Sequence, residues 1–344
     1  MTTLPLLPAT VIGSWSFPGW YAKFCDDAAR QPDLFGAADR DEAVRDAVRL
    51  AVDDQLRAGA DLITDGEMQR VDFNLGFYDH LTGLKPLPSG RRWGPPAHDQ
   101  RSRYLCVAPL AAPHGLGIVE EYRRLHGLTD APIKMPVPGP FTLAGCIDGG
   151  EVYRDRRAIA EALLPIVNRE LRALERVGVE FLQLDEPSFA CRPDRPEEFL
   201  DLIARTIEGV TAFTSLHMCF GNYRGRAVGR RSYRALFPHL ARAAVKQLAL
   251  EFASREMAEI ELAVEIKPPM GLAVGLVDVK NTWIEPPELV AERLRTVLRH
   301  IDAERVQVTP DCGFSQTARY VAVHKLAAMV EGVRMVREEI ETLH

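Results

Sequence analysis

The sequence predicts an α/β fold of the TIM (β/α)8 barrel type, and three observations support this class. Eight short apolar or β-branched runs each end in a turn that carries polar groups. Amphipathic helical patterns separate several of these runs. A length of 344 residues is typical of one barrel, and no linker, low-complexity segment or repeat divides the chain. We therefore expect a single catalytic domain over residues 1–344.

The eight runs are almost continuously apolar, as expected for parallel strands that are buried on both faces. They cover residues 9–14, 61–67, 131–139, 180–187, 214–221, 246–252, 272–280 and 306–314. Each run is short enough for a strand and too short for a typical helix.

Helical patterns lie between the runs, at residues 39–60, 156–178, 234–248 and 286–301. Two of them contain a proline, Pro165 or Pro238, which should bend or interrupt the helix. The segment between the second and third runs, residues 68–130, is long, rich in Pro and Gly and locally basic. We expect it to be a capping insertion after the second strand, outside the barrel wall.

Composition limits the function. Hydrophobic residues make up 47% of the chain and charged residues 26%, as in soluble globular proteins. A net charge of −6 provides no overall basic field, which argues against general nucleic-acid binding. No apolar stretch is long enough to span a membrane, and "MTTLPLLPAT" lacks the features of a signal peptide. The six cysteines are scattered without a C-x-x-C motif, which predicts reduced thiols and a cytoplasmic protein.

The stretch "SLHMCFGNY" places His217 and Cys219 two positions apart at the end of an apolar run. In a strand, residues i and i+2 point to the same side, so both side chains can leave one face of one strand. An isolated H-x-C is more often a buried thiol beside a hydrogen-bonded histidine than half of a metal site. The other strand ends decide between these interpretations.

In a TIM barrel the carboxyl ends of the strands meet at one mouth, where active sites lie. The ends of strands five, six and eight provide two thiols, an imidazole and a carboxylate, which together suit one tetrahedral zinc ion. The residues expected at this mouth are Ser14, Glu67, Asp185, His217, Cys219, Glu251, Lys280 and Cys312. Asp185 can instead cap the following helix, but Glu67 in the same mouth favours a binding role for it.

Eight segments of the chain resemble the cobalamin-independent methionine synthase family, in the family's order and over nearly the whole chain. They are "VIGSWSFP", "ITDGEMQR", "PVPGPFTLA", "LQLDEP", "HMCFGN", "LALEF", "VDVK" and "PDCGF". The resemblance implies a catalytic zinc ion held by His217, Cys219, Glu251 and Cys312. It also implies a homocysteine pocket built from Ile12, Gly13 and Ser14, in which Glu67 and Asp185 receive the ammonium group.

The ligand set itself favours alkyl transfer to sulfur. A thiolate is the nucleophilic form of a thiol, and zinc deprotonates a thiol that coordinates it. Two protein thiolates and a carboxylate make the metal electron-rich, so a bound substrate sulfur should stay nucleophilic. We therefore expect a zinc-dependent methyltransferase that converts homocysteine to methionine, with Asp185 and Lys280 as the candidate catalytic residues.

Three departures from the family pattern concern the methyl donor. The full-length enzymes that use folate carry an additional N-terminal barrel, and "GPFTLAGCIDGG" lacks the tryptophan that stacks on the folate. Lys280 stands where those enzymes have the histidine proposed as proton donor. The pattern is more similar to the short, single-barrel members, which predicts methylcobalamin or a corrinoid protein as donor. The basic segments 91–103 and 224–231 are candidates for docking an acidic donor protein, or are simply solvated.

Three other functions compete with this prediction. An epoxyalkane:coenzyme M transferase-like enzyme also loads a thiol on a zinc barrel, but two acids would repel the sulfonate of coenzyme M. Zinc hydrolases normally use His and carboxylate ligands around a bound water. A structural zinc in a binding module usually has ligands close together in sequence, unlike these three separate strand ends.

Overall fold

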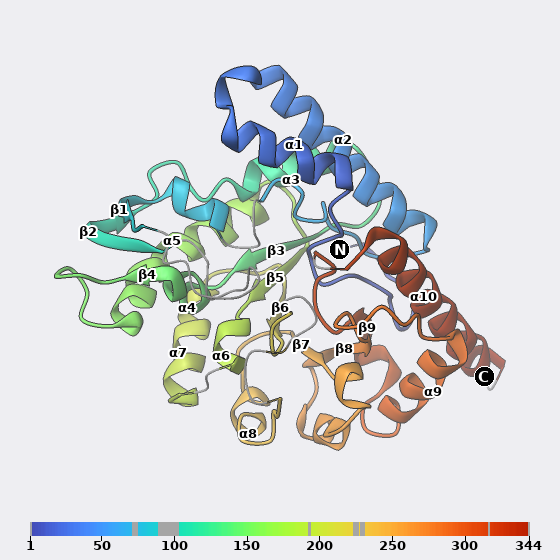
Figure 1. Cartoon of the computed structure of the whole chain (residues 1–344). Helices are drawn as coiled ribbons and strands as arrows, with labels where there is room; N and C mark the ends of the chain where they lie inside the picture. The colour runs from blue at the N-terminus through green and yellow to red at the C-terminus, as the bar shows by residue number, and fades with distance from the viewer. Residues whose placement is uncertain are drawn as a thin grey trace.

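The computed structural model describes residues 2–70, 75–88, 103–191, 194–222, 227, 231–315 and 317–342. A six-stranded parallel sheet, ordered β3-β5-β6-β7-β8-β9, forms its centre (Figure 1). Its strands are β3 (Lys134–Pro138), β5 (Phe181–Asp185), β6 (Phe213–Met218), β7 (Gln247–Glu251), β8 (Gly271–Val277) and β9 (Val306–Pro310). The last six of the eight predicted runs are therefore confirmed as strands, and every neighbouring pair in this sheet is parallel.

The first two predicted runs do not form regular strands in the described chain. They pair with the sheet only through isolated parallel bridges, Ala9 with Val308, Thr10 with Leu62, and Ile63 with Ile133. These bridges place the two short segments between β9 and β3, at the two edges of the six-stranded sheet. The regular sheet is thus narrower than the eight strands predicted.

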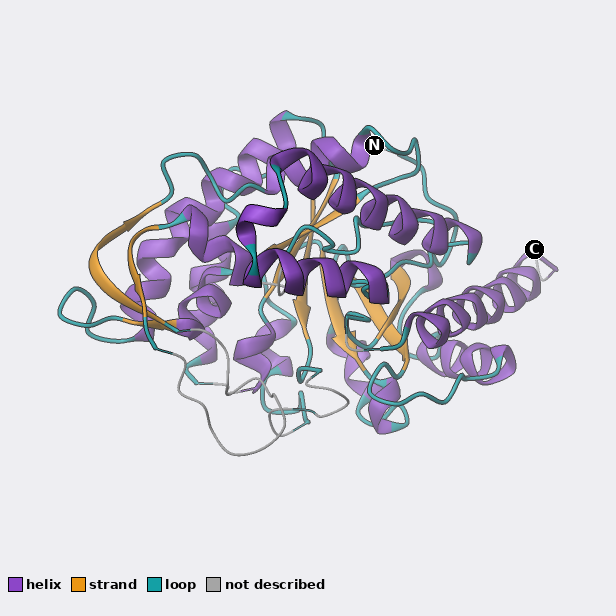
Figure 2. Ribbon diagram, turned by 45° about the horizontal axis from the view of Figure 1, so that its top comes forward, coloured by secondary structure: helices purple, strands orange, loops and turns teal. Residues whose placement is uncertain are grey.

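Helices surround the sheet (Figure 2). The α-helices are α1 (Gly19–Arg30), α2 (Ala37–Arg57), α3 (Ile118–His126), α4 (Pro140–Leu143), α5 (Arg156–Arg176), α6 (Pro187–Cys191), α7 (Pro196–Thr206), α8 (Phe237–Leu240), α9 (Pro287–Val297) and α10 (Arg319–Thr342). Short 3-10 helices cover Pro32–Leu34, Leu75–His80, Ala144–Cys146, Ala253–Arg255, Ile260–Glu265 and Ala303–Arg305. None of the helices in the described residues is both long and apolar enough to cross a membrane.

The structure excludes an interruption of the helix at Pro165, and it contradicts the helix predicted over residues 234–248. Helix α5 continues through Pro165, because Asp155 caps its first turn and its buried side chains, among them Leu163 and Val167, hold it against the core. The segment 234–248 is largely not helical, since α8 ends at Leu240 and β7 begins at Gln247. Pro238 occupies the first turn of α8, where a missing N–H is tolerated.

The segment 68–130 is more structured than the predicted capping loop. It contains an antiparallel pair of strands, β1 (Thr82–Pro86) and β2 (Tyr104–Ala111), and β2 also pairs with β4 (Ile147–Asp148). Helix α3 follows and packs between α2 and α5, as a helix of the surrounding layer does. Most of the basic segments 91–103 and 224–231 lies outside the described residues; Arg231 donates a hydrogen bond to the Ser254 carbonyl.

Candidate metal centre

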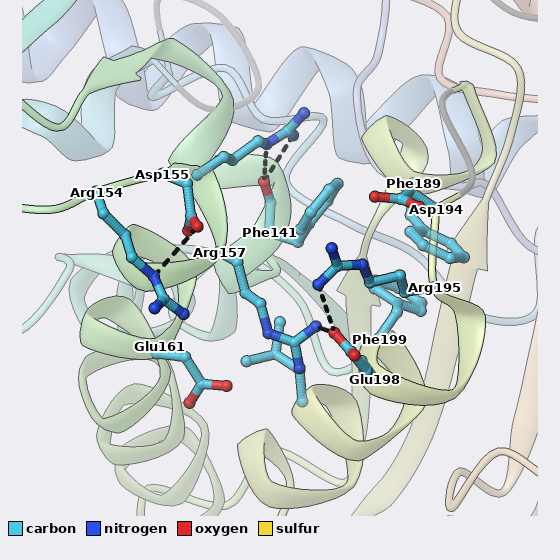
Figure 3. A pocket seen from close by; sticks show the side chains of 12 residues that line it. Phe141, Arg154, Asp155, Arg157, Glu161, Phe189, Asp194, Arg195, Glu198 and Phe199 are labelled. Atoms are coloured by element: carbon cyan, nitrogen blue, oxygen red, sulfur yellow. Dashed lines mark hydrogen bonds and ion pairs between the residues drawn. The ribbon is translucent and has the colours of Figure 1, made fainter.

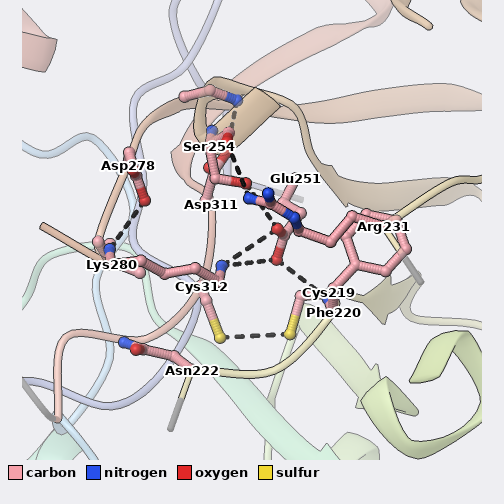
Figure 4. Close-up of polar contacts among 12 residues, drawn as sticks. Cys219, Phe220, Asn222, Arg231, Glu251, Ser254, Asp278, Lys280, Asp311 and Cys312 are labelled. Atoms are coloured by element: carbon pink, nitrogen blue, oxygen red, sulfur yellow. Dashed lines mark hydrogen bonds and ion pairs between the residues drawn. The ribbon is translucent and has the colours of Figure 1, made fainter. Parts of the chain in front are cut away.

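His217, Cys219 and Cys312 lie together at the carboxyl ends of their strands. His217 is the penultimate residue of β6, Cys219 directly follows the strand, and Cys312 comes two residues after β9. The sulfurs of Cys219 and Cys312 are 3.2 Å apart (Figure 4). One nitrogen of His217 and both sulfurs lie within 4.8 Å of one another, close enough to share one metal ion. Three of the four residues expected as metal ligands are therefore adjacent.

His217 is oriented by Asp185. Its Nδ1 lies 2.7 Å from Oδ1 of Asp185, and Gln183 Nε2 donates to the same oxygen at 2.9 Å. Since a carboxylate accepts a hydrogen bond, Nδ1 carries the proton and Nε2 presents its lone pair. Nε2 is buried and has no hydrogen-bond partner in the described structure. A metal ion bound at Nε2 would satisfy this atom, so the residues present fit a zinc site.

The two thiols are hydrogen-bonded to each other. The hydrogen bond from Cys219 lowers the pKa of Cys312 to about 7, with a further contribution from the nearby charge of Lys280. The same hydrogen bond, together with burial, raises the pKa of Cys219 well above its usual range. Cys312 is therefore the thiol that loses its proton more readily, and a zinc ion would deprotonate both thiols that it binds.

Glu251 does not join this group of three. Its Oε1 accepts hydrogen bonds from Ser254 Oγ at 2.8 Å and Lys280 Nζ at 3.1 Å. Its Oε2 accepts from the Phe220 N–H at 3.0 Å and from Lys280 Nζ at 2.9 Å (Figure 4). Burial opposes a charge on Lys280, but Glu251 and Cys312 outweigh burial and raise the pKa of Lys280. Lys280 is thus an ion-pair partner of the predicted ligand Glu251.

Asp311 is a buried residue of this site that the sequence did not single out. Its Oδ1 accepts from the N–H groups of Phe252 and Ala253 at 3.0 and 2.9 Å, and its Oδ2 accepts from the Ser254 N–H at 2.5 Å. Asp311 thereby ties the chain that follows β7 to the end of β9. An acid directly before a cysteine, in "PDCG", was the only signal in the sequence.

The residues expected to form the amino-acid pocket also lie together. A Cβ on Gly13 would stand 2.6 Å from Oε1 of Glu67, so the backbone at Gly13 adjoins this carboxylate. Gln183 donates to both Ile12 O and Asp185 Oδ1. A Cβ on Gly313, next to Cys312, would collide with Ser14 Oγ, so Ser14 adjoins the end of β9. The structure therefore joins all five predicted pocket residues, Ile12, Gly13, Ser14, Glu67 and Asp185, to the metal-ligand cluster.

Glu67 has cationic neighbours that the sequence did not reveal. Arg70 Nη1 lies 3.1 Å from Glu67 Oε1, and Arg70 also pairs with Glu121 at 2.7 Å. Burial raises the pKa of Glu67 well above its usual range, and the charge of Arg70 opposes this rise. Lys134 is a second cationic neighbour. Burial lowers its pKa to about 7, although the charges of Asp185 and Glu67 favour its charged form.

A separate hollow of about 310 Å³ lies beside α4, α5 and α7 (Figure 3). The guanidinium of Arg156 stacks 3.9 Å from the ring centroid of Phe141 and donates to the Phe141 carbonyl. Four arginines and four acids line the hollow, so its charges balance and we assign no ligand to it. Its lining is Phe141, Arg154, Asp155, Arg156, Arg157, Glu161, Phe189, Asp194, Arg195, Glu198, Phe199 and Leu202.

Comparison with known proteins identifies the family. A profile of the family described as "Cobalamin-independent synthase, Catalytic domain" matches residues 7–334. Proteins named methionine synthase from Thermococcus kodakarensis and Pyrococcus furiosus are 33% and 32% identical; each alignment covers 98% of this chain and 95% of the relative. A solved B12-independent methionine synthase from Shewanella sp. W3-18-1, in complex with selenomethionine, has a TM-score of 0.84. It is 28% identical, and the match covers 98% of this chain and all of that one.

A more distant structure, a putative vitamin-B12 independent methionine synthase from Listeria monocytogenes, shares the fold with a TM-score of 0.71 at 19% identity. The descriptions of the family and of the Shewanella protein both specify independence from cobalamin, so they do not support the corrinoid donor predicted from the sequence. The profile match over most of the chain and the relatives above 30% identity lead to one conclusion. This chain belongs to the cobalamin-independent methionine synthase family, in the part that the family description calls the catalytic domain.

Proposed function

We propose that this protein transfers a methyl group to the thiol of homocysteine, forming methionine, at a zinc ion held by His217, Cys219 and Cys312, with Glu251 as the fourth ligand that the family resemblance implies. The observation that carries the proposal is the cluster of two sulfurs and one imidazole, in which His217 Nε2 is buried without a partner. The printed names of the Thermococcus and Pyrococcus relatives support the reaction. The selenomethionine in the Shewanella structure supports an amino-acid site, since it is methionine with selenium in place of sulfur.

The zinc ion, when bound, supplies the means of keeping the substrate thiol as a thiolate at neutral pH. The protein's own residues prepare for this. Asp185 fixes the orientation of His217 through the 2.7 Å contact to Nδ1. Two cysteine sulfurs make the donor set electron-rich, which favours attack by a bound thiolate over activation of water. Glu67 and Asp185, beside Ile12, Gly13 and Ser14, would receive the substrate's ammonium group.

The amino-acid pocket distinguishes homocysteine from other thiols. Glu67 and Asp185 are both buried acids; Arg70 pairs with Glu67, and both acids favour the charged form of the buried Lys134. An ammonium group gains from the two carboxylates, whereas the sulfonate of coenzyme M is repelled by them. An epoxyalkane:coenzyme M transferase-like reaction is therefore the second candidate, and the pocket charge argues against it.

We further propose that the chain is one (β/α)8 barrel over residues 1–344. The three parallel bridges support this, because they join β9 to residues 9–10, these to residues 62–63, and the latter to β3. A barrel closed in this way would bring the carboxyl ends of residues 9–14 and 61–67 to the same end of the barrel as Cys312. None of the six cysteines forms a disulfide in the described structure, in keeping with the cytoplasmic location we propose.

The family description argues against a corrinoid as the methyl donor, and the missing stacking tryptophan is a weaker argument against methyltetrahydrofolate. The family description specifies independence from cobalamin, and methyltetrahydrofolate is the donor of the full-length enzymes that the chain resembles. An unstacked pterin loses only about 0.5–1.5 kcal/mol beyond burial, which weakens a folate site without excluding it. We therefore propose methyltetrahydrofolate in place of the corrinoid.

Metal analysis of Cys219→Ala and Cys312→Ala, compared with Cys191→Ala, tests the metal centre. Cys191 lies in α6, outside the cluster, so its variant should keep one zinc ion per chain. The two site variants should lose zinc and methionine formation while circular dichroism shows an intact fold. Full zinc retention in both site variants would rule out the proposed ligand set.

An assay of the zinc-loaded protein tests the reaction. Homocysteine is offered with methyltetrahydrofolate and, separately, with methylcobalamin at the same concentration, and methionine is quantified. We expect methionine with methyltetrahydrofolate. Product only with methylcobalamin would contradict the proposed donor but not the methyl transfer. Alkylation of coenzyme M in preference to homocysteine would favour the second candidate.

A further inference from the structure

The carbonyls that lead into the amino-acid pocket are held by side chains. No backbone N–H of the described residues donates to the carbonyls of residues 11–13, because the bridges of this segment to its neighbours end at Thr10. Each of these carbonyls instead accepts a side-chain hydrogen bond from another part of the fold. The pairs are Val11 with Lys134, Ile12 with Gln183, and Gly13 with Thr64. These contacts therefore fix where the pocket segment lies.

Lys134 is the unusual member of this set. The residue is only 4% exposed, and burial disfavours its charged form, so its pKa falls to about 7. The charges of Glu67 and Asp185 act on it, but within the described residues its side chain donates only to the Val11 carbonyl and forms no ion pair. A lysine that is costly to bury thus holds one carbonyl of the pocket segment.

The backbone of Lys134 is fixed independently of its side chain. Its N–H donates to the Ile63 carbonyl at 2.8 Å, and β3 pairs with β5 along its whole length. The side chain therefore reaches from a regular strand to the irregular segment at residues 11–13. Oε1 of Glu67 lies 2.6 Å from the position of a Cβ on Gly13, so a shift of this segment would move the pocket backbone relative to the carboxylate.

We propose that Lys134 is a positioning residue for amino-acid binding, because its hydrogen bond to Val11 fixes the backbone of residues 11–14 beside the two acids of the pocket. This inference rests on the proposed function, since it concerns the pocket for the thiol substrate. In the described structure the hydrogen bonds of Lys134 include no metal ligand, so we expect its effect on amino-acid binding and not on the metal. A neutral amine also donates a hydrogen bond, so the contact with Val11 survives deprotonation of the lysine.

The contacts define a matched set of variants. Lys134→Met removes the donor to Val11 while it keeps a side chain of similar length. Thr64→Val removes the hydroxyl that donates to the Gly13 carbonyl and changes no charge. Thr206→Val is the control, because it removes an equally buried hydroxyl that donates to the Leu202 carbonyl within α7.

Calorimetric titration of the zinc-loaded protein with L-methionine measures binding without methyl transfer. Lys134→Met and Thr64→Val should bind methionine about tenfold more weakly than the wild type, because each loses a hydrogen bond that fixes the pocket backbone. Thr206→Val should bind it as the wild type does. The analogue of methionine without an amino group does not use the two acids, so both pocket variants should lose less affinity for it. Both should keep the wild-type zinc content.

Lys134→Met has a second readout that a merely structural role would not give. It removes a buried charge, so it should raise the free energy of unfolding at pH 7 while it lowers the affinity for methionine. With homocysteine as substrate, KM should rise by a similar factor and kcat should stay near the wild-type value. Higher stability together with weaker binding indicates a residue that serves the pocket at a cost in stability.

The outcomes separate the inference from the proposed function. Wild-type affinity for methionine in Lys134→Met would overturn the inference and leave the proposed function intact. An equal loss for methionine and its amino-free analogue would show a general structural role, and this also overturns the inference. Failure of the wild type to bind methionine would instead refute the proposed amino-acid pocket. If Lys134→Met does not fold, Lys134→Leu makes the same test, and wild-type affinity in Thr64→Val would show that side-chain contacts do not fix the segment.

Discussion

Oδ1 of Asp185 accepts hydrogen bonds from two residues that belong to different parts of the site. One donor, His217, is a candidate metal ligand; the other, Gln183, also reaches the carbonyl of Ile12 in the amino-acid pocket. A carboxylate behind a metal-bound histidine typically raises ligand basicity and fixes the ring. Asp185 thereby links the orientation of the metal ligand to the geometry of the substrate pocket.

Glu67 should contribute to the recognition of the amino group. For Glu67→Gln we expect homocysteine use to fall about ten- to a hundredfold, because a charge-assisted hydrogen bond is worth roughly 1.5–3 kcal/mol. Use of a thiol without an amino group should change far less. The measurement is kcat/KM for both thiols.

Glu121→Gln is the matched control, because it breaks the other ion pair of Arg70 without removing the Glu67 carboxylate. If Glu67→Gln lowers the use of both thiols equally, Glu67 has a structural role and does not bind the ammonium group.

Lys134 should make stability depend on pH. Burial lowers its pKa in the folded chain to about 7 from 10.5. Between these values the unfolded chain binds more protons than the folded chain, so the lysine's contribution to stability rises with pH and its penalty is complete below pH 7. Replacement by Met removes this term.

The free energy of unfolding, measured by denaturant titration at pH 7 and pH 9, checks this expectation. Lys134→Met should gain stability relative to the wild type at pH 7, and the gain should shrink at pH 9. A difference that does not change with pH would show that the pKa of Lys134 is not lowered in the folded state.

At the scale of elements, the ends of β7, β8 and β9 approach one another closely at Gly275. A Cβ at this position would lie 2.3 Å from Asp311 Oδ1, 2.8 Å from the Asp311 Cα and 3.1 Å from the Glu251 Cα. Two of these atoms are backbone atoms, one at the end of β7 and one directly after β9, and cannot rotate away. The missing side chain of Gly275 therefore sets the spacing between the strand that carries Glu251 and the strand that leads to Cys312.

Gly275→Ala should therefore push these strands apart. We expect a loss of about 1–3 kcal/mol in the free energy of unfolding, as for other overpacked core sites, and weaker zinc binding. Gly19→Ala is a suitable control, because no atom lies within 4 Å of a Cβ placed there. Chelator competition and denaturant titration measure the two effects, and unchanged zinc affinity would mean that the strand ends tolerate the displacement.

The elements that the sequence predicted best are those with a local signal. The six central strands are continuous apolar runs, and the segments that became α2, α5 and α9 have clear periodicity. The error at 234–248 arose because an apolar pattern cannot show where a helix gives way to a strand. The hairpin of β1 and β2 was missed because its pairing joins residues on either side of a long Pro- and Gly-rich stretch.

The candidate site was predictable to a similar extent. Strand ends identified His217, Cys219 and Cys312, since parallel strands bring their carboxyl ends together. The partners of those residues were not predictable, because contacts such as Lys280 with Glu251 or Asp311 with Ser254 depend on side-chain directions between separate strands. The resemblance identified Glu251 as a ligand, and only the contacts show how its oxygens are occupied.

At the scale of the whole molecule, the first and last parts of the chain are held together. Arg337 of α10 donates hydrogen bonds to the carbonyls of Leu6 and Leu7, and α10 packs against α2 and α9 (Figure 1). Thr10 N–H donates to the Val308 carbonyl, and Val308 N–H donates to that of Pro8. The pocket residues Ile12 to Ser14 follow directly on this N-terminal segment.

This connection has a consequence for the order of folding. The hydrogen bond between Thr10 and Val308 closes a loop that contains nearly the whole chain, and such non-local contacts form late because loop-closure entropy opposes them. Pulse-labelling hydrogen exchange during refolding should therefore protect the amides of β6 and β7 before those of Thr10 and Val308. Simultaneous protection would contradict this order. During synthesis, the amino-acid pocket would then remain incomplete until the last strand and helix have left the ribosome.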